Sequence, residues 1–167
     1  MYAGLATHNA RLFQEVIAMY LWIVFLHVLS AFLFMLAHGA TAAVMFAMQS
    51  ERSPERLKVL LAVRDRAQMP FTITSTVMFL SGIALGFMGG FWGRIWIWAA
   101  LVLLVVISVF MGFLGRNRLD KIKSLVDSRT AAVELETAIT AANPMLLSIV
   151  GIGGFILILW LMMFKPF

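Results

Sequence analysis

The stretch VIAMYLWIVFLHVLSAFLFMLAHGATAAVMFAM, residues 16–48, is the longest apolar run of the chain. Three further apolar runs follow at about residues 70–91, 95–115 and 145–164. Each is near or above the ~20 residues that a helix needs to cross a bilayer. Hydrophobic residues make up 62% of the 167 residues and charged residues 13%, which is far from the balance of a soluble domain. We therefore predict an all-α fold, a four-helix transmembrane bundle.

The four runs predict a single multi-pass membrane domain over residues 16–167. Residues 1–15 are more polar, and we expect them to form an extracytoplasmic tail or a short surface helix. The first run is too long for a simple crossing, because about 33 helical residues at ~1.5 Å each exceed the ~30 Å hydrocarbon core. One end of this helix must therefore tilt or project.

Basic residues predict the orientation of the spans, since they concentrate in cytoplasmic loops. Most of the 13 lysines and arginines lie in the two long connections, after spans one and three. They are Arg52, Arg56, Lys58, Arg64, Arg66, Arg116, Arg118, Lys121, Lys123 and Arg129. Both long connections are thus predicted to be cytoplasmic and both termini to lie outside. The five tryptophans, Trp22, Trp92, Trp96, Trp98 and Trp160, would then mark the outer interface.

The net charge of +5 has the same explanation, because anionic lipid headgroups attract basic residues at the cytoplasmic surface. No nucleic-acid partner is expected, since the aromatic residues lie on the other side of the membrane. The absence of cysteine excludes disulfides and thiolate metal sites. We expect the lipid bilayer as the main partner, and a homo-oligomer or a larger membrane complex as the working state.

Helix-start signals occur in both long connections. Ser53 followed by Pro54 is typical of a capped helix start, and we expect a short helix there that ends before Pro70. Asn143 and Pro144 predict the start of the fourth span.

An apolar edge follows the third span. Leu119, Ile122, Leu125 and Val126 recur at helical spacing opposite basic residues, which predicts an amphipathic extension along the inner leaflet. Glycines at helical spacing indicate close helix packing, and these are Gly82, Gly86, Gly89, Gly112, Gly115, Gly151, Gly153 and Gly154.

His27 and His38 are the candidate functional residues. Eleven residues at ~100° each return to within about 20° of one direction, so both imidazoles share a face of the first helix. Ionisable residues inside a span usually face a bundle interior or a cavity, which makes this pair a functional-site hypothesis. About 16 Å of helix separates them, so they cannot share one metal ion. His8 lies outside the membrane and is expected to be a surface residue.

Stacked haem groups suit such spacing, with each imidazole as an axial ligand at its own level. The second ligand would then come from a neighbouring protomer or from Met35, Met78, Met88, Met111 or Met145, unless the iron stays five-coordinate.

Hydrogen bonding is the alternative for both histidines. His38 is expected at the level of the hydroxyls of Thr72, Thr74, Ser75 and Thr76. Methionine thioethers near His38 also leave copper binding open, although methionine is an ordinary filler of membrane helices.

The motif Tyr20-Leu21-Trp22-Ile23, followed by Leu26-His27-Val28-Leu29 and His38-Gly39, resembles the first helix of a group of bacterial four-span proteins. The group contains an uncharacterised predicted integral membrane protein family and, more remotely, the copper-resistance D proteins and the haem-binding membrane protoporphyrinogen oxidase. The ending Trp160-Leu161-Met162-Met163-Phe164-Lys165-Pro166 resembles that of members of the uncharacterised family. The resemblance implies a multi-pass protein of the bacterial cytoplasmic membrane, and it implies that His27 matches an axial haem ligand of the haem-binding relatives.

Three hypotheses for the function follow. The first is electron transfer through b-type haem, with His27 as axial ligand and His38 as a second ligand or second haem site. The second is a non-catalytic structural or assembly subunit without a cofactor, in which the histidines only form hydrogen bonds. The third is transport of copper or of a small solute. The sequence leaves open whether the protein is an enzyme.

Overall fold

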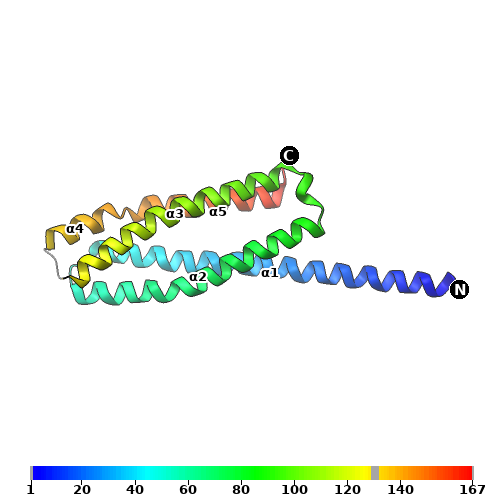
Figure 1. Ribbon diagram of the computed structural model, residues 1–167, viewed down its shortest axis with the longest axis horizontal. Helices are drawn as coiled ribbons and strands as arrows, with labels where there is room; N and C mark the ends of the chain where they lie inside the picture. Colours follow the sequence, from blue (N-terminus) through cyan, green and yellow to red (C-terminus); the bar gives the residue numbers. More distant parts are fainter. Residues whose placement is uncertain (1, 129–131, 167) are drawn as a thin grey trace.

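The computed structural model describes residues 2–128 and 132–166, and within these ranges every regular element is helical (Figure 1). The four long helices are α1 (Tyr2–Ser50), α2 (Pro54–Met88), α3 (Ile95–Asp127) and α5 (Pro144–Phe164). A 3-10 turn, η1 (Phe91–Gly93), precedes α3, and a short helix, α4 (Ala132–Ala141), precedes α5. Four stretches are long and apolar enough to cross a membrane: Arg11–Ser50, Pro54–Met88, Ile95–Asp127 and Val133–Phe164. The predicted all-α fold with four spans is confirmed.

Helix α1 is longer than the sequence predicted. Residues 2–15, expected as a tail or a separate surface helix, continue the first span without a break. No proline interrupts the 49 residues of α1, and at ~1.5 Å per residue the helix is about 74 Å long. Its amino-terminal part therefore projects beyond the other helices (Figure 1).

Helix α2 begins where the sequence predicted. The Ser53 hydroxyl accepts a hydrogen bond from the Arg56 backbone N–H, and Pro54 occupies the first turn. The expected short helix is not separate, however, because α2 runs through Pro70 as one helix of 35 residues. A proline removes one backbone hydrogen bond, but membrane helices tolerate this loss when packing and nearby hydroxyls compensate for it.

The long helices pack as two antiparallel pairs, α1 with α2 and α3 with α5. Contacts between the pairs are fewer (Figure 1). The carboxyl terminus and the projecting part of α1 lie at the same end of the bundle (Figure 1). The side of the membrane on which this end lies stays a prediction.

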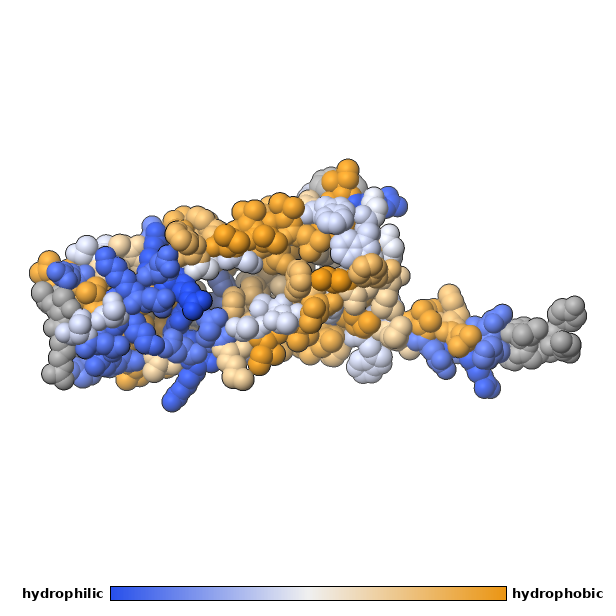
Figure 2. All heavy atoms as spheres, in the orientation of Figure 1, coloured by the Kyte–Doolittle hydropathy of each residue, from blue (hydrophilic) through white to orange (hydrophobic). Residues whose placement is uncertain are grey.

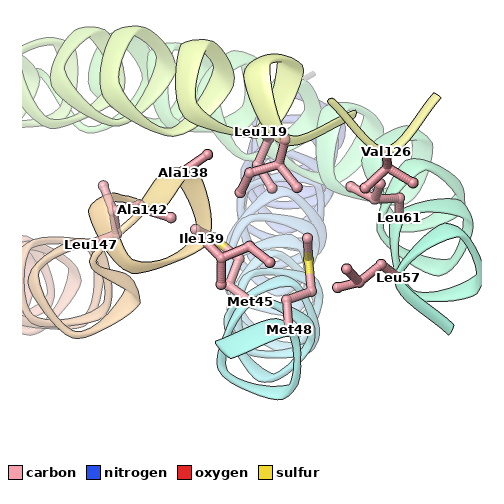
Figure 3. Close-up of a cluster of buried hydrophobic side chains, with 11 residues drawn as sticks. Met45, Met48, Leu57, Leu61, Leu119, Val126, Ala138, Ile139, Ala142 and Leu147 are labelled. Carbon is pink, nitrogen blue, oxygen red and sulfur yellow. The ribbon is translucent and has the colours of Figure 1, made fainter. Parts of the chain in front are cut away.

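The main hydrophobic core lies at the opposite end, which Figure 2 shows to be covered by polar side chains. All five described helices contribute to it (Figure 3). Its members are Met45, Met48, Leu57, Leu61, Leu119, Ile122, Val126, Ala138, Ile139, Ala142 and Leu147. The predicted extension of the third span is therefore present, but its apolar edge at Leu119, Ile122 and Val126 faces this core and not a lipid leaflet.

Helix α4 was not predicted. It closes the core with Ala138 and Ile139, and the Arg118 guanidinium donates a hydrogen bond to the carbonyl of Ala142, 2.8 Å away. Asn143 then adopts a left-handed conformation with φ 44°, and its side chain accepts a hydrogen bond from the Leu146 backbone N–H. The predicted restart of the chain at Asn143 and Pro144 is confirmed.

A second, smaller cluster closes the other end of the bundle. Trp96, Ile97, Ala100 and Leu161 are buried there. The Trp98 indole N–H donates to the carbonyl of Trp92, and the Lys165 ammonium lies 4.7 Å from the ring centre of Phe91. The two helix pairs thus pack against each other at both ends of the bundle. His27 and His38 of α1 lie between these two clusters.

Candidate functional site

His27 and His38 both face other helices, as their shared stripe predicted, but their neighbours differ. His27 contacts α2, whereas His38 contacts α2 and α5. Both side chains are half-buried.

The His27 ring is held by two polar groups of α2. Its Nδ1 lies 2.9 Å from the backbone carbonyl oxygen of Met78 and 3.1 Å from the Ser81 hydroxyl oxygen. A Cβ added at Gly82 would lie 3.1 Å from Cε1 of the imidazole. The glycine therefore lets the ring lie close to the α2 backbone, where both oxygens are within reach.

These contacts determine which nitrogen carries the proton. A carbonyl oxygen can only accept, so Nδ1 must be the protonated nitrogen that donates to Met78. The Ser81 hydroxyl has a single proton, and the Val77 carbonyl lies 2.6 Å from it, so Ser81 accepts from His27. The Nε2 atom consequently carries the free lone pair of the neutral ring.

Two serines complete the surroundings of His27. Ser81 is 5% exposed, and Ser30, one turn along α1, is 3% exposed and donates to the His27 carbonyl. Sequence reasoning did not single out either serine. The signal was present, because each is a lone hydroxyl in an otherwise apolar segment and Ser81 adjoins Gly82.

His38 has apolar neighbours. Its ring stacks near Phe34, with 6.3 Å between ring centres, and lies 6.4 Å from the ring centre of Phe71. Its Nε2 is buried against Gly151 of α5 and has no hydrogen-bond partner among the described residues.

The hydroxyls predicted to satisfy His38 are engaged elsewhere. Those of Thr72, Thr74, Ser75 and Thr76 each donate to a carbonyl of their own helix. His8 is exposed on the projecting part of α1, as expected for a surface residue.

The described residues contain no group of three or more His, Cys, Asp or Glu side chains placed to hold a metal ion. A shallow, open groove of about 420 Å³ lies on α3 and contains neither histidine. It is lined by Val105, Val106, Val109, Phe110, Phe113 and Leu114. His38 lies about 16 Å further along α1, so any cofactor at His27 would use a single imidazole from this chain.

The four apolar helices and the apolar outer surface define a multi-pass integral membrane protein. Residues 21–166 match the model of the family described as "Predicted integral membrane protein (DUF2269)", and the chain belongs to this family. The predicted membership of an uncharacterised integral membrane family is confirmed, while the remoter similarity to copper-resistance D proteins and protoporphyrinogen oxidase stays a prediction. No curated protein and no solved structure matches the chain.

Proposed function

We propose that this protein binds b-type haem in the bacterial cytoplasmic membrane and takes part in electron transfer, with His27 as the axial ligand. The observation that carries the proposal is the hydrogen bond from Nδ1 of His27 to the carbonyl of Met78. Metal-binding histidines usually donate their second ring N–H to a carbonyl or carboxylate, which fixes the ring and leaves the other nitrogen free to coordinate.

The residues around His27 fit this role in their chemistry. Met78 fixes the tautomer and Ser81 adds a second acceptor at the same nitrogen. Gly82 sets the distance of the ring from α2. Bound haem would supply one-electron chemistry, and its potential would depend on the axial ligand and the burial of the site.

The proposal depends on His27 alone. Nε2 of His38 lies against the backbone of Gly151, which leaves that atom facing α5. The prediction that His38 serves as a second ligand or a second haem site therefore gains no support from this contact. Substitution of His38 is accordingly the control for substitution of His27 in the experiment below.

A second candidate function is a non-catalytic structural or assembly subunit. The same contacts favour it, because the bonds from His27 to Met78 and Ser81 join α1 to α2 without any cofactor. Hydrogen bonds between membrane helices are worth about 0.6 kcal/mol on average, so this role is energetically modest.

Visible absorption of the full-length protein, purified in mild detergent from haem-replete cells, separates the two candidates. Haem binding predicts a Soret band in the wild type, loss of the band in His27→Ala and its retention in His38→Ala. Gly82→Ala should weaken the band, because the added methyl group would displace the ring.

A folded but colourless wild-type preparation would reject haem binding and favour the subunit. Folding is checked independently by circular dichroism and size-exclusion chromatography. Stoichiometric copper in the metal analysis, without haem, would favour the transport hypothesis.

A further inference from the structure

Helices α2 and α3 approach each other closely near both ends of the bundle and separate in between. At the polar end, the Lys123 ammonium lies 2.8 Å from a carboxylate oxygen of Asp65. At the other end, a Cβ added at Gly86 would lie 3.3 Å from the side chain of Ile97. Figure 2 shows a hollow between α3 and α2, beside the hydrophilic end of the molecule. The two helices thus enclose a crevice between these contacts.

The α2 wall of this crevice is polar. Thr72 and Thr76 follow Asp65 by seven and eleven residues, so they lie within about 20° of the direction in which Asp65 meets α3. Gln68, one turn before Thr72, donates to the Thr72 hydroxyl oxygen at 3.4 Å. All three side chains are exposed. Residues that would pack against α3 in a closed bundle are therefore uncovered.

The α3 wall consists of small residues. Gly112 precedes Lys123 by eleven residues, and Ser108 lies one turn further along the same side of α3. A Cβ added at Gly112 meets nothing within 4 Å among the described residues. Ser108 is exposed, and its hydroxyl has no hydrogen-bond partner in the described parts of the chain. The space in front of this wall is open.

The crevice reaches into the apolar part of the bundle. The third apolar run ends at about residue 115, and Ser108 lies seven residues, or about 10 Å, inside this end. This distance is roughly one third of the ~30 Å hydrocarbon core. Thr72, on the opposite wall, directly follows Phe71, whose ring lies beside His38. The crevice therefore extends to the level of His38.

The lining of the crevice suits water better than a lipid chain. The Ser108 hydroxyl and the Gln68 amide oxygen lack partners among the described residues, and unpaired polar groups are costly in hydrocarbon. Arg116, seven residues before Lys123 on the same side of α3, is 79% exposed and connects the crevice to the polar end. Polar residues inside membrane spans usually face a bundle interior or a water-filled cavity.

The outer side of α3 differs at the same height. Val106 and Phe113 point away from the crevice and are 58% and 68% exposed. Both are apolar, as expected for residues that contact lipid. One helix thus presents a small, polar side to the crevice and an apolar side to its surroundings.

We propose that the space between α2 and α3 is a water-filled crevice, open at the polar end of the bundle and lined by Gln68, Thr72, Thr76, Ser108 and Gly112. It brings water, and the protons that water exchanges, to the level of His38. The proposal is independent of haem binding, because His27 lies about 16 Å further from the polar end along α1.

The chain contains no cysteine, so single substitutions test the crevice by thiol labelling of the full-length protein. Ser108→Cys and Gly112→Cys are treated in open membrane fragments with a charged, water-soluble methanethiosulfonate. Val106→Cys and Phe113→Cys, at matching heights on the outer side of α3, are the controls. The two crevice variants should react at least about tenfold faster than the controls, because the reactive thiolate forms where water reaches it.

The other outcomes of the labelling would overturn the proposal. Equal rates at crevice and control positions would show that the two sides of α3 have the same surroundings. If the crevice variants react only with a lipid-soluble maleimide, an acyl chain fills the space. If they react with neither reagent, another protein segment covers the α3 wall. Complete labelling after unfolding in SDS verifies that each thiol is intact.

A second measurement uses nitroxide spin labels at Ser108→Cys and Val106→Cys in proteoliposomes. The label at position 108 should collide more often with a water-soluble nickel chelate than with oxygen, which concentrates in lipid. The label at position 106 should show the reverse preference. The same preference at both positions would overturn the proposal, whatever the labelling rates.

Discussion

The imidazole of His38 lies directly against the backbone of Gly151, so that a Cβ at position 151 would overlap Nε2 of the ring. This contact joins α1 to α5 and is one of the few close approaches between the two helix pairs. A glycine is required there because the ring occupies the space of a side chain.

Gly151→Ala should therefore destabilise the protein by about 1–3 kcal/mol, since an inserted methyl group forces the ring or the helix to move. Gly153→Ala is the matched control, because a Cβ there meets nothing within 4 Å among the described residues. The control should be neutral or stabilising by up to ~1 kcal/mol, owing to the higher helix propensity of alanine. An SDS titration of the unfolding of each variant measures both changes in the free energy of unfolding. Equal effects of the two substitutions would contradict the assigned contact.

Leu57→Ala should be among the most damaging substitutions in α2. The side chain is 0% exposed in the core at the polar end of the bundle, and loss of buried methyl groups costs about 2–5 kcal/mol. Leu80→Ala, in the same helix but 59% exposed, should change stability by less than ~0.5 kcal/mol. The same SDS titration compares the stability of the two variants. A larger loss of stability in Leu80→Ala than in Leu57→Ala would show that the core lies elsewhere.

Asn143 combines a left-handed backbone with a helix cap. Its φ is 44° and its side-chain oxygen accepts from the Leu146 N–H at 3.1 Å. Asn143→Ala removes the cap and strains the backbone, with an expected cost of about 1–2 kcal/mol. Asn143→Gly should cost only a few tenths of a kcal/mol, because glycine adopts this conformation freely. Thermal unfolding followed by circular dichroism compares the two. If both cost the same, the left-handed conformation is not the source of the effect.

The turn between α1 and α2 should loosen in acid. The Glu51 carboxylate accepts hydrogen bonds from the backbone N–H groups of Ser53 and Arg52, and these bonds lower the pKa of Glu51. A lowered pKa means that the carboxylate stabilises the turn above its unfolded-state pKa and that this contribution disappears as the pH falls through the folded-state value.

Limited proteolysis at residues 50–54 should thus increase below about pH 4 in the wild type, where an ordinary glutamate becomes protonated. Glu51→Gln should be cleaved at a rate that changes little over the same pH range after correction for the protease. A wild type and a variant with the same pH dependence would exclude Glu51 as the cause.

Local patterns predicted much of this fold. The four apolar runs predicted the spans, Ser53 and Pro54 predicted the start of α2, and Asn143 predicted the start of α5. Helix α4 escaped prediction because it has only ten residues, and its packing partners are helices α1 and α3 and not its own sequence neighbours.

The site was predictable only in part. Two histidines on one helix face can be read from periodicity, but their partners come from helices whose packing order the sequence does not contain. Ser81 and not a threonine of the same helix faces His27, since the vertical offset between α1 and α2 decides which hydroxyl is within reach. The same offset places Phe71 beside His38.

The sequence by itself determined that this chain spans a membrane four times and carries two imidazoles on one stripe, because hydropathy and the 3.6-residue helical period act locally. Only the tertiary structure decided that the Met78 carbonyl fixes the tautomer of His27, that the Gly151 backbone covers His38, and that α1 extends past its neighbours. These features arise from contacts between segments far apart in the chain, where the geometry of packing, and not the preference of any one segment, sets the outcome.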